Sequence, residues 1–563
     1  MSQIAQQNNA AQSDPASLST KVFREFKGVY TQASRTAIPE GYFYNLENII
    51  PIGEQNAHVV PNISAPLATY TDIVYWSQSV NLNGTEYLVN FTTNGKVFLF
   101  NITTGSNNQI NVGNLLSGSG SQCDQWQNTA ILFIDSTGYY SYDGTTFSKI
   151  TGTGVPTAGQ SIAVYSSYVW IVNGRQLFVN GLGGGFIYGA ASWTAANGAQ
   201  VVNLIDPQIR GTVQRLKAQN GYLYLIANTG INVISDVTVP AGASPPAATF
   251  SNQNIQALIG TDQPASVFAY DRLMMFASRY GTHTLFGVSS PKVSGDIDGT
   301  WQYLDFNQPI SGGQVVVANI LCGAFLLKRL NDPNFGSNTI VALWFQSSDT
   351  SPQTGVTETT DIWWFANFGA LTFIVSGIKN NIPALYALSP FNSVTGKWLN
   401  AALVPDGWTN GSVVGDWISA PSQQLYQLFA DSTTAPRVNI QTKLWPMEDE
   451  LARKEAITAG LEAFYYLFGS QIQLTLDTER QSTPLNLNNN FPTGNWVNAA
   501  RITGTWINLL SQTGSWLVPV LFISPADAQG GYGRHVGLTL TSTGYSYELH
   551  LLALDYKLRD RWL

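Results

Sequence analysis

The stretch QWQNTAILFIDSTGYYSYDGTTFSKI, Gln125–Ile150, carries the pattern that decides the fold. Its apolar run Ile131–Ile134 is rich in strand formers, and Tyr139–Tyr142 is a second short run with aromatic residues. Ser136-Thr137-Gly138 separates the two runs and Asp143-Gly144 follows the second. We expect a tight primed turn at Asp143-Gly144, because glycine accepts the positive φ that such a turn needs. The stretch therefore predicts an antiparallel meander of short strands.

Variants of this meander recur from about Leu67 to about Val438. Strand runs begin 37 to 54 residues apart near eight positions: Tyr87, Ile131, Tyr168, Tyr222, Arg272, Phe325, Leu371 and Gln424. A period of roughly 40 to 50 residues, with about four short strands in each repeat and no helix, is typical of a β-propeller. We therefore expect a mainly all-β chain, with a propeller of about six to eight blades over residues 67–438.

The flanking regions differ from the repeats. Residues 1–20 are rich in Gln, Asn and Ser and are predicted to form a mobile arm. Residues 21–66 and 439–563 lie outside the propeller, and the latter reads as a separate β region. Within it, MEDELARKEAITAGLEAFYYLFG, residues 447–469, has acidic residues in its first turn and an apolar stripe. These features predict one helix over 447–469.

Charged residues make up 11% of the chain, less than half of the usual share of about 25%. The formal net charge is −8, and no cluster of Lys and Arg resembles a surface that grips phosphate groups. This composition argues against nucleic-acid binding by charge neutralisation, but an acidic wall would let nucleic acid pass. Cys123 and Cys322 belong to no CxxC pair, so we expect two buried free thiols, with one long-range disulfide as the alternative.

No motif for catalysis or cofactor binding stands out. The four histidines lie at no metal-binding spacing: His58, His283, His535 and His550. Phosphate-binding loops, nucleophile elbows and dinucleotide-binding fingerprints do not occur, so we expect no metal, no cofactor and no enzymatic activity. The N-terminus lacks the features of a secretory signal, and no run of about 18 apolar residues predicts a transmembrane helix. We expect synthesis in a cytoplasm.

One motif leaves a second class of function open. SGDIDGTW, Ser294–Trp301, approaches the SxDxGxxW turn of sialidase-type propellers, although Gly299 comes one place late and the motif occurs once. Trp- and Tyr-rich loops also suit stacking on sugars. The alternative is therefore a carbohydrate-binding or carbohydrate-cleaving propeller, such as a tail-associated lectin or depolymerase.

The two ends of the chain carry a family resemblance. FKGVYTQASRTAIPEGYFYNLENIIPIG, Phe26–Gly53, resembles the start of the tail nozzle proteins of short-tailed bacteriophages, also called tail tube B or packaged-DNA stabilisation proteins. The closing segment Gly537–Trp562 is similar to the end of that family, and the usual Arg-x-Gly after the N-terminal segment is missing here. The matching N-terminal positions are Phe26, Gly28, Pro39, Gly41, Asn45, Asn48 and Gly53.

The resemblance implies a structural virion protein in the phage tail. It implies a homohexameric nozzle below the portal-adaptor complex, which retains the genome and then passes it during ejection. The N- and C-terminal segments would form a platform, and the seven matching residues would contribute to the contact between platform and adaptor. The implied partners are further copies of the chain, the portal-adaptor protein, tail fibre or needle proteins, and genomic DNA that passes without sequence-specific binding.

Overall fold

The structure is a computed structural model, and the chain in it is mainly β, as predicted. The one α-helix among the described residues is the four-residue α1, Asp298–Trp301. The described residues are 18–52, 56–182, 187–205, 210–256, 258–350, 357–392, 398–399, 405–406, 422–447, 450, 452–465, 471–485, 506–507, 513–514, 520–528, 532–544 and 547–561.

The chain forms two compact units, each built from separate segments. Unit 1 comprises residues 1–62, 346–367 and 431–563, and unit 2 comprises residues 63–345 and 368–430. The sequence interpretation assigned residues 67–438 to the repeats. Residues 346–367 and 431–438 of that range belong to unit 1 instead.

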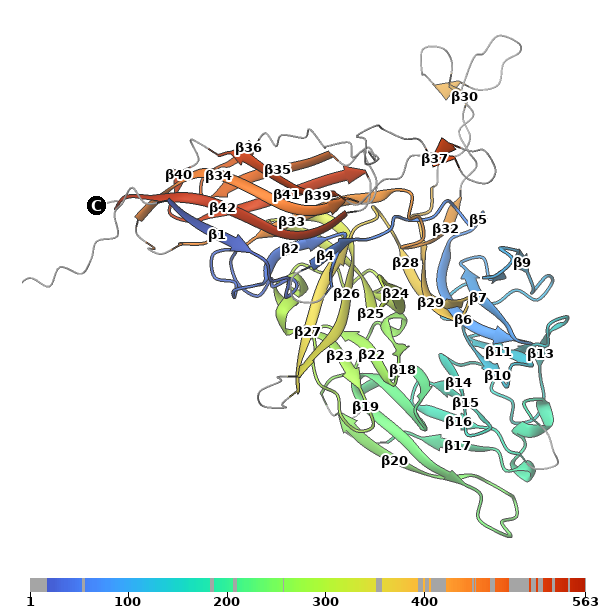
Figure 1. Ribbon diagram of the computed structural model, residues 1–563. Helices are drawn as coiled ribbons and strands as arrows, with labels where there is room; N and C mark the ends of the chain where they lie inside the picture. Colours follow the sequence, from blue (N-terminus) through green and yellow to red (C-terminus); the bar gives the residue numbers. More distant parts are fainter. Residues whose placement is uncertain are drawn as a thin grey trace, which may run out of the picture. The chain divides into compact units, whose positions relative to one another are not determined.

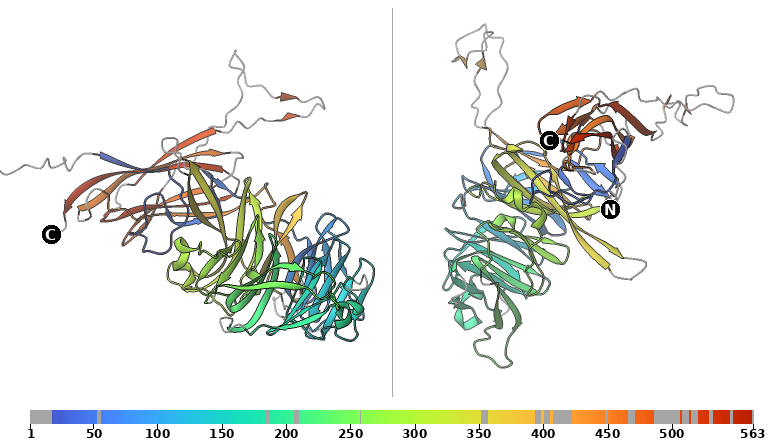
Figure 2. Two further views of the ribbon diagram at one scale, coloured as in Figure 1. Left: turned by 90° about the horizontal axis from the view of Figure 1, so that it is seen from below. Right: turned by 90° about the vertical axis from the view of Figure 1, so that its left-hand side faces the viewer.

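Unit 2 contains seven groups of antiparallel strands in succession: six small sheets and the first three strands of a nine-stranded sheet (Figures 1 and 2). The first sheet has β6 (Val74–Leu82), β7 (Thr85–Thr92), β8 (Val97–Asn101) and β9 (Asn107–Gln109) in order. The second has β10 (Gln122–Trp126), β11 (Ala130–Asp135), β12 (Gly138–Tyr142) and β13 (Phe147–Ile150). The third has β14 (Ser161–Tyr165), β15 (Tyr168–Asn173), β16 (Gln176–Val179) and β17 (Gln200–Asn203). The next two are β18 (Arg210–Gln219), β19 (Tyr222–Thr238) and β20 (Thr249–Gln256); and β21 (Phe268–Tyr270), β22 (Leu273–Ser278) and β23 (Gly281–Leu285). The sixth begins with β24 (Ser311–Val317), β25 (Ile320–Asp332) and β26 (Gly336–Thr350), and the seventh is β28 (Phe373–Lys379), β29 (Ile382–Leu388), β32 (Gln423–Gln427) and β5 (Ala68–Tyr70).

The first strands of most of these sheets lie beside one another. Strand β6 contacts β10, β10 contacts β14, and β14 contacts β18. In addition, β21 contacts β24, β24 contacts β28, and β28 contacts β6. A core cluster that includes Tyr224, Ile226 and Met274 joins the sheet of β18 to the sheet of β21. Strand β5, which precedes β6 in the chain, pairs with β32 and so completes the last sheet.

The strand runs predicted from sequence occur at the same place in successive sheets. The first six strand runs each start at or next to the second strand of one sheet, on β7, β11, β15, β19, β22 and β25. The last two runs, near Leu371 and Gln424, lead into β28 and β32, which share one sheet. Eight runs therefore correspond to seven sheets.

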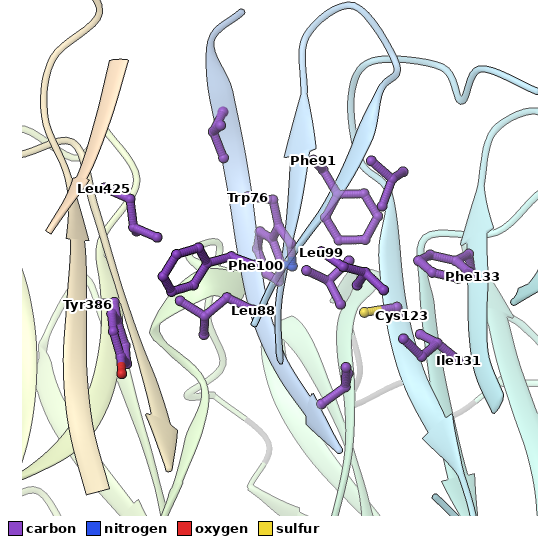
Figure 3. Close-up of a cluster of buried hydrophobic side chains, with 14 of the residues drawn as sticks. Trp76, Leu88, Phe91, Leu99, Phe100, Cys123, Ile131, Phe133, Tyr386 and Leu425 are labelled. Atoms are coloured by element: carbon purple, nitrogen blue, oxygen red, sulfur yellow. The ribbon is translucent and has the colours of Figure 1, made fainter. Parts of the chain in front are cut away.

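Large apolar side chains fill the spaces between neighbouring sheets. Figure 3 shows one such cluster. The last sheet contributes Tyr386 and Leu425 to it, the first sheet contributes Trp76 and Phe100, and the second contributes Phe133. Phe91 and Phe133 meet edge to face, with ring centroids 6.1 Å apart and an interplanar angle of 73°. Because neither face of such a sheet is buried within the sheet itself, stacking against the neighbours supplies the core.

The stretch Gln125–Ile150 forms the predicted meander, with one turn different from the prediction. Ser136-Thr137 is the tight two-residue turn, since Asp135 pairs with Gly138. The Asp143-Gly144 turn is longer, because Tyr142 pairs with Phe147 across four residues. Asp143 accepts hydrogen bonds from the backbone N–H groups of Thr145 (2.8 Å) and Thr146 (2.7 Å), an Asx-type turn in place of the expected primed turn.

Unit 1 contains two groups of long strands from distant parts of the chain (Figure 1). One sheet has β3 (Ile49–Ile52), β4 (Asn56–Val59), β42 (Tyr547–Arg561), β34 (Ala452–Tyr465) and β39 (Val520–Asp527) in order, with β1 (Leu18–Phe23) on β42 and β40 (Tyr532–Gly533) on β34. The other group has β27 (Thr357–Ala366), β2 (Phe43–Glu47), β33 (Ala435–Thr442), β41 (Val536–Gly544), β35 (Gln471–Thr478) and β36 (Ser482–Leu485) in order, and these are the last six strands of the nine-stranded sheet that begins with β24, β25 and β26. Two short pairs remain: β37 (Trp506–Ile507) with β38 (Thr513–Gly514) in unit 1, and β30 (Trp398–Leu399) with β31 (Pro405–Asp406) in unit 2.

The predicted helix over residues 447–469 is wrong. Residues 452–465 form strand β34, which pairs with β42 on one side and with β39 on the other. Ala459, Leu461 and Ala463 are buried while Gly460 and Glu462 are partly exposed, the period of two that a strand requires. Pairing on both sides provides hydrogen bonds and burial that outweigh the local helix propensity.

Two further expectations concern the N-terminus and the cysteines. The predicted mobile arm over residues 1–20 is too long, because Leu18–Thr20 pair with Asp555–Lys557 in β1 and β42. Residues 1–17 lie outside the described residues. Cys123 and Cys322 are buried free thiols, as predicted.

Candidate functional site

Phe26 and Gly28, two of the seven residues in the resemblance, pack the N-terminal segment inside unit 1. The Phe26 ring stacks on Phe43 with centroids 5.2 Å apart and an interplanar angle of 4°. Gly28 has φ +105°, and a Cβ atom there would lie 2.8 Å from the carbonyl oxygen of Trp363. The backbone of Gly28 thus comes closer to β27 than any side chain would allow.

The side chains of Asn45 and Asn48 form hydrogen bonds to backbone groups of distant residues. Asn45 Nδ2 donates to the carbonyl of Asn439 at 3.3 Å. Asn48, with φ +63°, donates from Nδ2 to the carbonyls of Arg437 (2.7 Å) and Asn367 (3.2 Å), and its Oδ1 accepts from Asn367 N–H at 2.8 Å. Asn48 therefore connects all three chain segments of unit 1 through one side chain.

The Pro39–Gly41 turn lies at the surface of unit 1. Pro39 is exposed and Gly41 is partly exposed, with φ +81°. The seventh matching residue, Gly53, lies outside the described residues.

A depression of 130 Å³ lies beside this turn, lined by residues that include Phe23, Glu40, Tyr42 and Trp445. Glu40 pairs with Lys21 and accepts a 3.0 Å hydrogen bond from Trp445 Nε1. Partial burial would raise the pKa of Glu40, but the hydrogen bonds from Lys21 and Trp445 outweigh it and hold the pKa below its usual value. A charged carboxylate at the surface therefore lies beside the exposed side chain of Val22 in β1.

Arg35 links the N-terminal segment to three strands of the C-terminal part. Its Nη2 donates to Asp477 Oδ2 at 2.7 Å and to the carbonyl of Leu538 at 3.3 Å, and its Nε donates to the carbonyl of Thr442 at 2.7 Å. Thr539 Oγ1 also bonds to the Asp477 carboxylate. One guanidinium thus uses its planar set of donors to tie together β33, β35 and β41.

The two segments that carry the resemblance are neighbours in the fold. Strand β42 belongs to the closing segment. It pairs with β1, which lies just before the opening segment, and with β4, which lies just after it. Arg35, in the opening segment, reaches Leu538 and Thr539 in the closing one. Four of the seven matching residues, Phe26, Gly28, Asn45 and Asn48, are buried, and their contacts join them to Phe43, to residues 363–367 and to residues 437–439.

Unit 2 contains a cavity of 360 Å³, which we call the inner cavity. Its lining comes mainly from the first strands β6, β10, β18, β21, β24 and β28, so it lies where these strands approach one another. Amide and hydroxyl side chains are frequent in the lining, as at Ser79, Gln125 and Gln314, and the charged lining residues are Glu86, Arg215 and Lys217.

Other candidate chemistry is sparse in the described part of the chain. No three His, Cys, Asp or Glu side chains come together there in a way that could hold a metal ion. His283 is buried against Phe276 with ring centroids 5.2 Å apart, and burial lowers its pKa to about 4. None of the helices in those residues has the length and hydropathy to cross a membrane.

Sequence reasoning named Asn48 and Gly28 only as matching positions of the resemblance, and it missed Arg35 as a connecting residue and the basic pair of the inner cavity. The partners of Arg35 lie more than 400 residues away in the chain, and no local pattern marks them. Arg215 and Lys217 at alternate positions of a strand were a signal, since alternate residues share one face of a sheet.

Comparison with known proteins identifies no family. Neither a protein-family model nor a curated protein matches the chain. Among solved structures, Hsv2 of Kluyvelomyces marxianus is similar over 54% of this chain and 96% of its own length, with 7% sequence identity and a TM-score of 0.25.

Proposed function

We propose that the chain is a structural virion protein, the nozzle of a short phage tail. Six copies would form a conduit below the portal-adaptor complex that retains the genome and passes it during ejection. Unit 1 would be the platform, and unit 2 would be a β-propeller with seven blades. The succession of seven antiparallel strand groups, the contact of β28 with β6 and the completion of the last sheet by β5 support the propeller.

The observation that carries the proposal is the union of the two chain ends in unit 1. The opening and closing segments are the parts that resemble nozzle proteins, and the resemblance implies that they build one platform. In this chain β42 pairs with β1 and β4, and Arg35 bonds to β33, β35 and β41. These contacts between the opening and closing parts of the chain support the proposal that the two segments form one functional part.

The charge of the chain supports passage of DNA. With 27 basic and 35 acidic residues, the chain offers little attraction to a phosphate backbone. A conduit that retained DNA by ion pairs would slow ejection, so a weakly charged acidic wall suits the proposed role. This account expects no catalysis by the chain.

The direct test is assembly with the adaptor protein from the same tail. We expect the purified chain to join the adaptor in rings that electron microscopy resolves as six-fold, with unit 1 at the adaptor. A matched variant is Pro39→Ala with Gly41→Ala in the exposed turn, which should weaken the complex, against Gly84→Ala in an exposed turn of unit 2 as a control. A chain that never joins the adaptor would contradict the proposal.

The second candidate is a carbohydrate-binding or carbohydrate-cleaving propeller. The observation in its favour is the inner cavity, whose amide, hydroxyl and aromatic lining suits a sugar. Binding and hydrolysis measured on a panel of bacterial polysaccharides would separate the candidates. Release of sugars by the purified chain would favour the second candidate over the nozzle.

A further inference from the structure

Two basic side chains line the inner cavity from one strand of unit 2. Arg215 and Lys217 are alternate residues of β18 and share a face, while Leu216 between them packs into a core cluster. A register shift between Val213 and Arg215 in the pairing of β18 with β19 comes directly before them. Such irregularities re-aim the side chains that follow.

Arg215 is held in place but keeps unused donors. It is 4% exposed, its Nη2 donates to Gln78 Oε1 at 3.0 Å, and its guanidinium lies 5.0 Å from the Trp76 ring centroid. Gln78 is itself fixed by a 2.6 Å hydrogen bond to the carbonyl of Cys123. Arg215 Nε and Nη1 have no acceptor among the described residues. Burial of a guanidinium with unused donors costs free energy that an acceptor would offset.

Neither cation has a carboxylate partner within ion-pair distance in the described part of unit 2. Glu86 also lines the cavity, but Asn81 Nδ2 donates to it at 2.8 Å. Asp124 acts on both cations electrostatically, and its two oxygens already accept from the backbone N–H groups of Val164 (2.7 Å) and Gln125 (2.9 Å). The positive charge of the pair is therefore only partly balanced.

The pKa values of the pair reflect this environment. Burial lowers the pKa of Arg215 to about 10, which leaves the guanidinium charged at neutral pH. Burial also lowers the pKa of Lys217, and the negative charge of Asp124 opposes that effect. A second negative charge in the cavity would act in the same direction as Asp124 and favour both charged forms.

We propose that the inner cavity of unit 2 is a binding site for a small oxyanion, a phosphate or a carboxylate, held by Lys217 and Arg215. The volume of 360 Å³ exceeds that of a bare ion, so the ligand carries a small polar body. Ser79, Gln125 and Gln314 supply hydroxyl and amide groups for it. A sugar phosphate or a sugar acid fits this description. The inference goes beyond the nozzle assignment and does not depend on it.

Titration calorimetry on the full-length chain tests the site with inorganic phosphate, D-glucuronate and neutral D-glucose. We expect one site per chain for an anion and no binding of glucose. Binding of phosphate alone or of glucuronate alone would support the site and identify the oxyanion that it takes. Lys217→Gln should weaken binding about tenfold, because it removes a charge-assisted hydrogen bond, and Lys217→Arg should restore most of it.

Two controls keep the test decisive. Arg272→Gln removes an exposed cation of the same unit and should leave binding unchanged. Lys217 is less buried than Arg215, so its variants are expected to fold even if Arg215→Gln does not. No binding of either anion, binding unchanged in Lys217→Gln, or glucose bound as tightly as glucuronate would each overturn the proposal.

Discussion

Arg35 Nη2 donates a 2.7 Å hydrogen bond to Asp477 Oδ2, although 442 residues separate the two in the chain. Both side chains are largely buried, at 17% and 5% exposure. The pair connects the opening segment of the chain to the sheet of β33, β41 and β35. Its loss tests whether the two chain ends depend on each other.

Arg35→Met should destabilise unit 1 by about 3 kcal/mol, because it leaves the buried Asp477 carboxylate without its cation. Native-state hydrogen exchange of the β41 amides measures this loss locally. Arg35→Met combined with Asp477→Leu should recover part of it, since the charge is then gone. The control is Arg24→Met at an exposed position. Equal exchange in Arg24→Met and Arg35→Met would show that Arg35 does not hold the sheet.

Asn48→Ala should lower the free energy of unfolding by about 3 kcal/mol. The change removes three side-chain hydrogen bonds to Asn367 and Arg437 and leaves alanine at a positive φ. Asn83→Ala is the matched control, because Asn83 has φ +51° but an exposed side chain, and it should cost about 1 kcal/mol. Urea denaturation measures both variants, and a smaller loss for Asn48→Ala than for Asn83→Ala would contradict the role of Asn48.

Asp135 and Asp143 make similar turns at different depths in one meander. Asp135 is fully buried and accepts from the N–H groups of Ser117 (2.7 Å), Thr137 (2.7 Å) and Gly138 (3.2 Å). Asp135→Ala should cost about 3 kcal/mol, because buried donors lose a charged acceptor. Asp143→Ala, at an exposed turn, should cost about 0.5 kcal/mol. Thermal unfolding of the two variants gives the comparison, and equal melting temperatures would argue against this difference.

His283 gives unit 2 a pH dependence with a defined sign. Burial, helped by the charge of Lys292, lowers the pKa of His283 in the folded chain to about 4, from about 6.5 in an unfolded chain. Between these values the unfolded chain binds the proton and the folded chain does not. Stability from this residue is therefore complete above pH of about 6.5 and falls by about 2 to 3 kcal/mol toward pH 4.

His283→Phe should flatten that part of the stability profile, because the ring still stacks on Phe276 but does not titrate. Chemical denaturation at several pH values between 4 and 7 measures the slope. A slope unchanged in His283→Phe would show that His283 does not carry it.

The meander and its repeat could be predicted from sequence because their signals are local. Ile131 pairs with Tyr142 in the hairpin that the apolar and aromatic runs indicated. The spacing of the runs located the second strand of six successive sheets. The count of sheets could not be read from it, because β5 and β32, which complete one sheet, lie more than 350 residues apart.

The errors arise where distant pairing decides the structure. Residues 452–465 have local helix propensity, but β42 and β39 make them a central strand. The contacts of Asn48 and Arg35 span between 319 and 504 residues of chain. No pattern within a short window of sequence identifies such partners, and the resemblance of the chain ends did not indicate them.

The mass of the purified chain, alone and with its adaptor protein, tests the central claim most directly. Six chains of 61.2 kDa amount to about 367 kDa. The nozzle account predicts that mass photometry finds six copies per adaptor ring, and that microscopy shows a closed ring. A single copy of 61.2 kDa that persists both alone and in the presence of the adaptor would contradict the account.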